Sequence, residues 1–491
     1  MELKNLLKDI EHSILNGDTN IDISSVEYDS RKVTAGSLFV AIKGYETDGH
    51  LYILKAIEAG AIAVILEEDS DIKYSNDIVT IKVDNSRKSL GFISSNFFGN
   101  PGNKLKIIGV TGTNGKTSIT YFLKSILKEA GYKVGIIGTI ENQIEDTVYE
   151  SAVTTPESRD IQELLAKMVE VGCEYCVMET SSHALYLDRV AAIPFKTAIF
   201  TNLTQDHLDF HKDFTEYLNA KKILFTYIGK DGFSILNGDD KTFVEISSMA
   251  GGKIVSYSIS EKSDYKATNI NMDINGTYFT LINNENSIKI NLKMIGEFSI
   301  YNSLAAIATA HELGIEFTTI QEGLRKVSVN GRFQLIESNK DFAVVVDYAH
   351  TPDGLYNVLS TARKITSGKV ICVFGCGGDR DKKKRPIMGK VAGENGDYLV
   401  ITSDNPRTEE PIKIIDMVEE GVKETSAKYI KITNRKEAIA YAIDMARSGD
   451  IVIIAGKGHE DYQIVGKTKY PFSDSEIARN ILDSKEWYYD L

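Results

Sequence analysis

Residues 110–131, VTGTNGKTSITYFLKSILKEAG, decide how the fold of this chain is interpreted. The run that precedes them, 105–110, is rich in β-forming residues and predicts a strand. Beyond the glycines, apolar residues recur at helical spacing, and Gly131 is placed to end the helix. These apolar residues are Ile119, Phe122, Leu123, Ile126, Leu127 and Ala130. The segment therefore predicts a strand, a glycine-containing loop and a helix.

The loop in this segment carries residues that suit a polyphosphate. Gly112 and Gly115 let the backbone turn its N–H groups inward, and the helix N-terminus adds positive potential. Lys116 adds a full charge, and Thr117 can offer a hydroxyl to Mg²⁺. Val110 stands where the usual pattern has its first glycine, so we interpret the segment as a variant phosphate loop.

The bulk composition limits the class of protein. A chain of 491 residues with 42% hydrophobic residues predicts roughly three domains. The formal net charge of -13 argues against nucleic acid or an anionic membrane as the main partner. No apolar stretch reaches the roughly 20 residues that a membrane helix needs, and the charged N-terminus MELKNLLKDIEHS lacks a signal-peptide core. We therefore expect a cytoplasmic protein.

The cysteines are spaced like a split zinc site, but another interpretation fits better. The two pairs are about 200 residues apart in strand-like segments, where cysteine behaves as a small apolar residue. They are Cys173 with Cys176 and Cys372 with Cys376. We therefore expect core residues and no zinc.

The order of strand-like and helical segments predicts an α/β protein with domains at 1–102, 103–332 and 333–491. Within residues 96–104, NFFGNPGNK is expected to be a linker. A β-hairpin is expected at 278–292. The last domain alternates short, continuous apolar runs with amphipathic segments, which predicts a doubly wound, Rossmann-like sheet with ligands at the strand C-termini.

Two strand ends in the central domain are rich in possible metal ligands. Glu179 and His183 follow one buried strand, and the next is followed by Asp206, His207, Asp209 and His211. Their convergence with the phosphate loop indicates a divalent-metal site. From these residues alone, a Mg²⁺-dependent nucleotide hydrolase, a kinase and a ligase all stay open.

Further motifs narrow this choice. In chain order they are TGTNGKT (111–117), METSSHAL (178–185), TNLTQDHLDFH (201–211), EYLNAKK (216–222), LNGDD (236–240), GEFSIYNSLAA (296–306), NGRFQ (330–334) and DYAHTPDGL (347–355). As an ordered set covering nearly the whole chain, they resemble the Mur ligase family, ATP-dependent enzymes that form amide bonds in peptidoglycan precursor synthesis. Ser299, Gln334 and Val153 depart from the family pattern.

Within the family, the chain is most similar to the enzymes that add the third residue of the stem peptide to UDP-N-acetylmuramoyl-L-alanyl-D-glutamate. The resemblance implies a UDP-binding N-terminal domain, a central ATP-binding domain and a C-terminal domain that binds the incoming amino acid. It also implies that the D-glutamate γ-carboxylate is activated by ATP as an acyl phosphate. A monomer that uses Mg²⁺ is expected.

The resemblance also implies roles for individual residues. ATP would be bound by Gly112, Thr113, Asn114, Gly115, Lys116, Thr117, Ser118, Asn302, Arg332, Asp347 and His350. Metal ions would be held by Thr117, Glu179, His207 and Lys221, the last as a carbamate formed with CO₂. Lys116, Lys221, His207 and Glu179 would be catalytic. The UDP-muramoyl-dipeptide would be bound by Ser30, Arg31, Thr154, Thr155, Ser181 and Arg189, with Asp29 beside the nucleotide.

The tetrapeptide DNPR resembles the recognition motif of family members that add meso-diaminopimelate. This amino acid differs from lysine by an extra carboxylate, which a guanidinium can bind in a bidentate manner. The implied site comprises Arg380, Asp404, Asn405, Pro406, Arg407, Gly456 and Glu460.

Other interpretations stay open. Lysine or another diamino acid could be the third residue, and folylpolyglutamate synthase shares TGTNGK, although its loop usually continues with Gly-Ser. From a different class, the chain could be a phosphate-loop ATP hydrolase or a nucleotide-binding regulator, neither of which needs a diamino-acid pocket.

Overall fold

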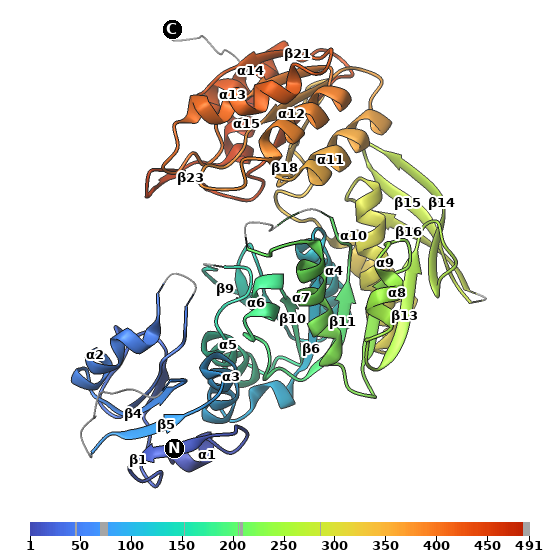
Figure 1. Cartoon of the computed structure of the whole chain (residues 1–491). Coiled ribbons are helices and arrows are strands. Elements are labelled where there is room, and N and C mark those ends of the chain that lie inside the picture. Colours follow the sequence, from blue (N-terminus) through green and yellow to red (C-terminus); the bar gives the residue numbers. More distant parts are fainter. Residues whose placement is uncertain are drawn as a thin grey trace.

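The computed structural model describes residues 1–44, 47–68, 77–151, 153–204, 206, 210–284 and 286–484. Three large sheets follow one another along the chain, each packed against helices. Figure 1 shows the N-terminal body at the bottom, the central body in the middle and the C-terminal body at the top. The predicted α/β class and three-domain organisation are confirmed, while the boundaries 1–102, 103–332 and 333–491 stay predictions.

The first domain contains a five-stranded sheet in the order β1-β5-β4-β3-β2. Its strands are β1 (Ser13–Asn16), β2 (Ser25–Glu27), β3 (Ser37–Val40), β4 (Ala61–Leu66) and β5 (Val79–Lys82), and its helices are α1 (Leu3–Leu6), α2 (Ile53–Glu58) and α3 (Ser86–Phe97). The expected linker is largely helical, because α3 extends to Phe97 and a 3-10 helix spans Pro101–Lys104. A proline in the first turn of a helix costs no hydrogen bond, so Pro101 begins this helix and does not interrupt the helical structure.

The central domain contains an 11-stranded sheet in the order β16-β15-β14-β13-β12-β11-β6-β10-β7-β8-β9. The strands are β6 (Lys106–Thr111), β7 (Val134–Ile137), β8 (Asn142–Ile144), β9 (Thr147–Tyr149), β10 (Tyr175–Glu179), β11 (Phe195–Phe200), β12 (Phe233–Asn237), β13 (Lys253–Ser258), β14 (Tyr265–Asp273), β15 (Gly276–Asn283) and β16 (Asn286–Leu292). The helices are α4 (Lys116–Glu129), α5 (Ser158–Glu170), α6 (Ser182–Tyr186), α7 (Phe214–Thr226), α8 (Phe243–Ser247), α9 (Glu297–Glu312) and α10 (Phe317–Lys326).

Strand β6 shows how this sheet is covered on both faces. Ile108 and Val110 pack with α4, α9 and α10, whereas Ile107 packs with α5, α6 and α7. This alternation is the period of two that a strand imposes. Strand β6 pairs in parallel with β10 and β11, so the chain segments that follow these three strands meet at one edge of the sheet.

The hairpin predicted at 278–292 is confirmed. Strands β15 and β16 pair antiparallel with Asn283 opposite Asn286, and Asn284 in the turn has a φ of 50°. Asparagine tolerates this left-handed conformation better than most residues, which explains the sequence signal.

The C-terminal domain contains a six-stranded sheet in the order β17-β18-β22-β19-β20-β21, which is parallel from β18 onward. Its strands are β17 (Gln334–Leu335), β18 (Ala343–Asp347), β19 (Val370–Phe374), β20 (Tyr398–Ile401), β21 (Lys428–Lys431) and β22 (Ile451–Ala455), with a separate hairpin of β23 (Tyr462–Val465) and β24 (Thr468–Pro471). Helices α11 (Pro352–Ile365), α12 (Lys384–Asn395) and α13 (Pro411–Val422) cover one face, and α14 (Arg435–Met445) and α15 (Asp474–Asp483) cover the other.

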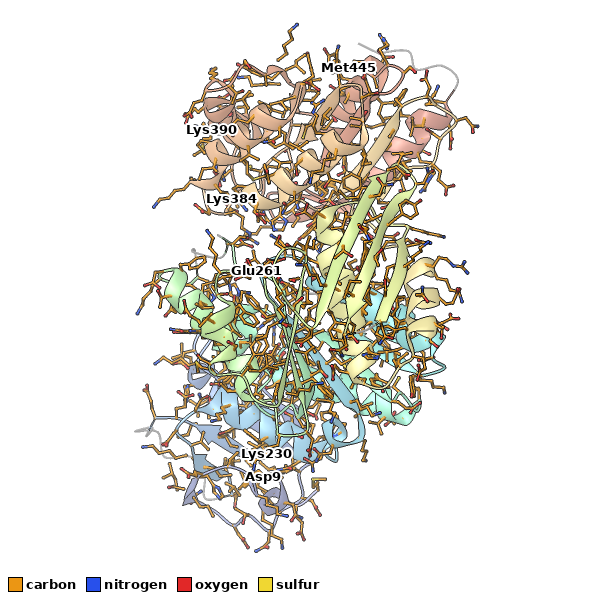
Figure 2. All side chains as sticks on the ribbon, turned by 90° about the vertical axis from the view of Figure 1, so that its right-hand side faces the viewer. Asp9, Lys230, Glu261, Lys384, Lys390 and Met445 are labelled. Atoms are coloured by element: carbon orange, nitrogen blue, oxygen red, sulfur yellow. The ribbon has the colours of Figure 1, made fainter. Side chains whose placement is uncertain are left out.

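The predicted doubly wound sheet is thus confirmed. Figure 2 shows Lys384, the first residue of α12, at the side of the C-terminal domain that faces the central domain.

All four cysteines are buried as free thiols.

Candidate active site

The predicted phosphate loop joins β6 to the N-terminus of α4. Gly112 and Gly115 have φ angles of 144° and 92°, which side chains disfavour. A Cβ atom would lie 1.7 Å from Thr201 Oγ1 at Gly112 and 2.3 Å from Asn302 Oδ1 at Gly115. Backbone conformation and close packing therefore both require glycine at these two positions.

The segment after β11 holds this loop in place. The Thr113 N–H donates to Asn202 O at 2.9 Å, and the Asn114 N–H donates to Asn202 Oδ1 at 3.0 Å. Thr201 Oγ1 donates to Asn114 O at 2.6 Å. The first N–H groups of a helix have no partner within the helix, and this arrangement binds phosphate groups.

Two lysines, the buried Lys221 and the half-buried Lys116, converge on one carbonyl of the loop. Lys116 Nζ donates to Gly112 O at 2.8 Å and to Thr113 O at 2.7 Å, and Lys221 Nζ donates to Gly112 O at 2.9 Å. Burial lowers the pKa of Lys116, and burial together with the charge of Lys116 lowers the pKa of Lys221 well below its usual value. The Lys221 amine is therefore neutral more often at pH 7 than an exposed lysine is.

Tyr217, which the sequence patterns did not single out, connects Lys221 to the loop. Its hydroxyl lies 3.1 Å from Thr113 Oγ1, and its ring centroid lies 4.4 Å from Lys221 Nζ. Tyr217 precedes Lys221 by four residues on α7, so one helical turn places both on the same face. That spacing is the signal by which the sequence could have indicated Tyr217.

Glu179 ends β10 beside the loop and is only 1% exposed. Thr117 Oγ1 donates to Glu179 Oε2 at 3.1 Å, and Thr139 Oγ1 donates to the same oxygen at 2.8 Å. Thr139 Oγ1 also lies 3.1 Å from Thr154 Oγ1. Arg332 Nη2 donates to Thr117 Oγ1 at 3.2 Å from the junction with the C-terminal domain. Groups from four separate segments thus meet around one buried carboxylate.

The donor set at Glu179 and Thr117 suits magnesium. Carboxylate and hydroxyl oxygens are its preferred protein ligands, and Mg²⁺ usually keeps several waters and binds through one or two carboxylates. Within the described ranges, no group of three or more His, Cys, Asp and Glu side chains could hold an ion by itself. The few protein oxygens therefore fit an ion that also binds a nucleotide.

The other predicted metal ligands are placed differently. His207 and Asp209 lie outside the described residues. His183 and His211 have ring centroids 5.7 Å apart, and both rings pack against Phe210. Among the described residues, no group of three or more His, Cys, Asp and Glu side chains includes them, and their role in a metal site with Glu179 stays a prediction.

Direct contacts link the phosphate loop to the C-terminal domain. Asn114 Nδ2 donates to Asp353 Oδ2 at 2.9 Å, and the Arg332 guanidinium lies 4.6 Å from the centroid of the Tyr348 ring. Together with the bond from Arg332 to Thr117, these contacts place residues after β18 beside the loop. The structure therefore brings the predicted nucleotide residues of both domains to one junction.

Asp347 lies buried at this junction, and His350 lies half-buried beside it. Asp347 accepts the Phe333 N–H at 2.6 Å and the Ala349 N–H at 2.7 Å, while burial raises its pKa. Burial lowers the pKa of His350, whose Nδ1 lies 2.8 Å from Tyr348 O. A neutral imidazole is consequently favoured at pH 7.

The structure brings four of the predicted dipeptide-binding residues together beside β10: Thr154, Thr155, Ser181 and Arg189. Thr155 Oγ1 donates to the backbone O of Glu179 at 2.7 Å, and the Ser181 N–H donates to Thr155 Oγ1 at 3.0 Å. Arg189 Nη1 donates to Thr155 O at 3.1 Å. The end of a single strand thus supports both this segment and the phosphate loop.

The predicted nucleotide-sugar residues of the first domain follow β2. Ser30 is buried, while Arg31 is exposed with its Nη2 atom 2.7 Å from Asp29 Oδ2, a contact that lowers the pKa of Asp29 to about 2. The Tyr28 hydroxyl donates to Asp160 Oδ2 on α5 at 2.6 Å. This hydrogen bond joins the first domain to the central one.

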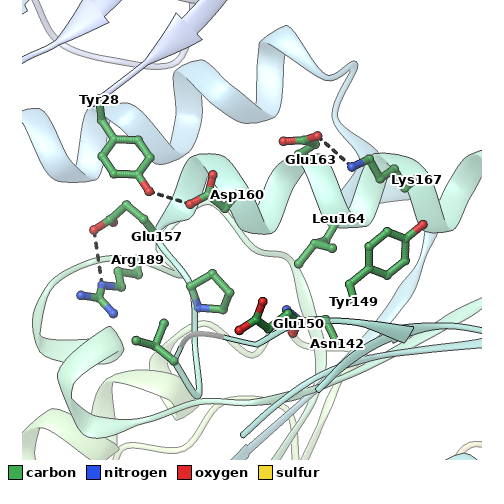
Figure 3. A pocket seen from close by; sticks show the side chains of 12 residues that line it. Tyr28, Asn142, Tyr149, Glu150, Glu157, Asp160, Glu163, Leu164, Lys167 and Arg189 are labelled. Atoms are coloured by element: carbon green, nitrogen blue, oxygen red, sulfur yellow. Dashed lines mark hydrogen bonds and ion pairs between the residues drawn. The ribbon is translucent and has the colours of Figure 1, made fainter. Parts of the chain in front are cut away.

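A pocket of about 480 Å³ lies beside the predicted dipeptide segment, which contains Thr154 and Thr155 (Figure 3). Its lining consists of Tyr28, Asn142, Tyr149, Glu150, Val153, Pro156, Glu157, Asp160, Glu163, Leu164, Lys167 and Arg189. Arg189 Nε lies 3.4 Å from Glu157 Oε2 at its wall, as the dashed line in Figure 3 indicates. The pocket therefore adjoins the predicted dipeptide segment.

The predicted diamino-acid residues come together at the strand C-termini of the last sheet. The DNPR loop (404–407) follows β20, Arg380 follows β19, and Gly456 and Glu460 follow β22. A Cβ atom on Gly456 would lie 2.7 Å from Asp404 Oδ2. Asn405 Nδ2 donates to Glu460 Oε2 at 2.9 Å. The order of the strands thus assembles residues that are far apart in sequence.

Two guanidinium groups, those of Arg380 and Arg407, lie near each other at this site. Arg407 has a φ of 50°, and its Nη1 donates to Gly378 O at 2.9 Å. Burial and the charge of Arg380 lower the pKa of Arg407. A carboxylate placed between them would offset this repulsion, so the pair suits an anionic ligand group.

An ion pair that the sequence did not reveal, between the buried Arg385 and the half-buried Glu409, fixes the loop carrying Arg380. Arg385 donates from Nη1 and Nη2 to the two carboxylate oxygens of Glu409 at 2.9 and 2.8 Å. Glu409 Oε1 also accepts the Asp379 N–H at 2.7 Å. Arg385 and Glu409 are therefore positioning residues between the two loops.

In the part of the chain that the structure describes, no helix combines the length and the apolar surface needed to cross a bilayer.

Comparisons with known proteins agree with this geometry. Family models match at residues 22–98 for the Mur ligase family catalytic domain, 110–310 for the Mur ligase middle domain and 331–458 for the Mur ligase glutamate ligase domain. The solved structure of a UDP-N-acetylmuramoyl-L-alanyl-D-glutamate--2,6-diaminopimelate ligase is similar, with a TM-score of 0.72 and 30% identity over 98% of this chain and 99% of that chain. A MurF structure from Acinetobacter baumannii, 20% identical with a TM-score of 0.67 over 98% of each chain, shares the fold.

Curated relatives match over almost the full length. A protein from Caldanaerobacter subterraneus subsp. tengcongensis is 47% identical over 99% of this chain and 100% of its own, and one from Clostridium tetani is 48% identical over 98% of this chain and 99% of its own. Both are named UDP-N-acetylmuramoyl-L-alanyl-D-glutamate--2,6-diaminopimelate ligase. The chain therefore belongs to the Mur ligase family.

Proposed function

We propose that this protein is an ATP-dependent ligase that adds meso-diaminopimelate to the D-glutamate γ-carboxylate of UDP-N-acetylmuramoyl-L-alanyl-D-glutamate, a step of peptidoglycan precursor synthesis. The names of its full-length relatives support this activity. One observation carries it. Glu179 contacts the phosphate loop through Thr117 at 3.1 Å and the dipeptide segment through Thr155 at 2.7 Å, so both substrates would meet at one strand end.

The reaction has to overcome the low reactivity of a carboxylate toward an amine. In the first step, a γ-carboxylate oxygen attacks the γ-phosphorus of ATP, the bond to the bridging oxygen breaks, and ADP leaves. In the second step, the amine nitrogen attacks the acyl carbon, phosphate leaves, and the nitrogen loses a proton. The protein must therefore neutralise the charge of the phosphoryl group and hold three substrates with their reacting atoms close together and aligned.

Lys116 and the loop N–H groups would bind the phosphoryl oxygens and offset the charge that develops on them. Thr117 and Glu179 would hold Mg²⁺, with His207 and a modified Lys221 as ligands of a second ion. When bound, such ions supply additional positive charge to the phosphate oxygens. Within the protein, Thr139 keeps Glu179 oriented through its bond of 2.8 Å.

Lys221 would act as a carbamate. Carbamate formation needs a neutral amine, and the lowered pKa of this buried lysine favours that form. A carbamate is anionic and offers oxygen ligands, whereas an ammonium group repels a metal ion. The Lys221 contact with Gly112 O at 2.9 Å places the group beside the phosphate loop.

The remaining roles follow the domain junctions. Asn302, Arg332, Asp347 and His350 would contact ATP together with Gly112, Thr113, Asn114, Gly115 and Ser118. Ser30, Arg31, Thr154, Thr155, Ser181 and Arg189 would bind the UDP-muramoyl-dipeptide. Arg380, Asp404, Asn405, Pro406, Arg407, Gly456 and Glu460 would bind the diamino acid. In this proposal, domains 1–102, 103–332 and 333–491 form a monomer, because one chain supplies every group that would bind a substrate. The proposed location of the enzyme is the cytoplasm.

Product mass tests the proposal in competition. The protein is given ATP, Mg²⁺, UDP-muramoyl-dipeptide and equal concentrations of meso-diaminopimelate and lysine. We expect the diaminopimelate product to dominate, and Arg407→Ala to raise the KM for diaminopimelate by about tenfold or more with a smaller change in kcat, because a bidentate ion pair is lost. Equal incorporation of lysine would contradict the diaminopimelate assignment alone, and absence of both products would contradict the ligase.

A further inference from the structure

Lys457 is a buried charge that the proposed mechanism does not use. It lies between Gly456 and Gly458, whose φ angles of 119° and 53° allow the tight turn after β22. The Lys457 side chain is 0% exposed, and its Nζ lies 2.7 Å from Glu460 Oε2. The turn therefore directs an ammonium group into the predicted diamino-acid site.

Lys457 belongs to a connected polar unit with Asn405 and Glu460. Lys457 Nζ donates to Asn405 Oδ1 at 3.2 Å, and the Ile464 N–H donates to the same oxygen at 2.9 Å. The Asn405 amide in turn donates to Glu460 Oε2 at 2.9 Å. Glu460 Oε2 thus faces both an amide donor and a full positive charge.

Stability alone does not explain this arrangement. Desolvation of two charges often outweighs their mutual attraction, so a buried ion pair is weak evidence for a stabilising role. Apolar side chains of similar volume could hold the turn at least as well. The position of the pair among Arg380, Arg407 and Asp404 points instead to an effect on the ligand.

We propose that Lys457 is a specificity-determining positioning residue, which balances the charge of Glu460 and thereby favours diaminopimelate over lysine. The inference rests on the proposed function. The distal end of diaminopimelate carries an ammonium and a carboxylate and is neutral, whereas that of lysine carries one positive charge. Without Lys457, the Glu460 carboxylate is left uncompensated and attracts the extra positive charge of lysine, because a nearby unit charge interacts strongly inside a protein.

The test measures the ratio of kcat/KM for diaminopimelate to kcat/KM for lysine. This ratio does not depend on the fraction of folded enzyme. We expect Lys457→Met to lower it by about tenfold or more. Lys457→Gln, which keeps a donor for Asn405, lowers the ratio similarly because the charge and not the hydrogen bond matters.

A double-mutant cycle with Glu460→Gln shows whether Lys457 acts through Glu460. In the Glu460→Gln background, we expect Lys457→Met to change the ratio by less than about twofold, because the carboxylate whose charge Lys457 balances is already absent. Lys413→Met serves as the matched control, because Lys413 has a 75% exposed side chain at the start of α13 and pairs with the nearby Glu410. It leaves the ratio unchanged.

The outcomes separate the inference from the proposed function. A wild-type preference for diaminopimelate that persists unchanged in Lys457→Met and Lys457→Gln would overturn the role of Lys457 and leave the ligase intact. An equal shift in both Glu460 backgrounds would show that Lys457 does not act through Glu460. A wild-type protein that ligates neither amine would overturn both.

Discussion

Replacement of Lys116 by methionine is expected to lower kcat for amide formation by about a thousandfold. The side chain keeps most of its length, but the site loses the charge that lies 2.8 Å from Gly112 O and 2.7 Å from Thr113 O. Phosphoryl transfer depends largely on positioning and charge neutralisation, so this loss falls mainly on the transition state. Rapid-quench measurement of ADP formation under single-turnover conditions gives the rate of the first step.

Lys128→Met on the same helix is the matched control. Lys128 Nζ pairs with Asp146 at 2.7 Å, and the side chain of Asp146 is 86% exposed, so its loss changes surface charge alone. Wild-type rates are expected for this control. If Lys116→Met retained more than about a tenth of wild-type kcat, the phosphate-loop assignment would fail.

Lys221→Ala is expected to lower kcat by a similar factor, and added acetate or another short carboxylate is expected to restore part of the activity. The substitution removes the group that would carry the carbamate, whereas a free carboxylate can supply comparable oxygen ligands. Removal of dissolved CO₂ is expected to lower the activity of the wild type and not that of the rescued variant. Steady-state phosphate release measures both effects.

Lys222→Ala controls for a general loss of charge on α7, because the half-buried Lys222 pairs with the exposed Glu245 at 3.3 Å. It is expected to behave like wild type with or without acetate. An inactive Lys221→Ala that no short carboxylate rescues, together with intact protein of unmodified mass, would contradict the carbamate while leaving the ligase assignment in place.

The phosphate loop could be predicted because its signals are local. Gly112 and Gly115 must be glycine for their φ angles and close contacts, and such constraints remain visible in the sequence. The short apolar runs of the last domain likewise predicted strands covered on both faces. Local backbone requirements and strand periodicity therefore accounted for most of the architecture.

Features that depend on tertiary contacts could not be predicted in this way. The proline at Pro101 suggested a linker, although it fits the first turn of a 3-10 helix. The packing of the His183 and His211 rings against Phe210 also depends on tertiary contacts, and their role as metal ligands stays a prediction. The pairing of Lys457 with Glu460 could not be predicted either, because it depends on the glycine turn that brings Lys457 Nζ to within 2.7 Å of Glu460 Oε2.

Phosphate release tests the central claim most directly. ATP and Mg²⁺ are mixed with the protein alone, with UDP-muramoyl-dipeptide, with meso-diaminopimelate, and with both acceptors together. The geometry at Glu179 predicts sustained phosphate release only when both acceptors are present, in equal amount to the amide product. Phosphate release at the same rate without either acceptor would identify an ATP hydrolase and contradict the account.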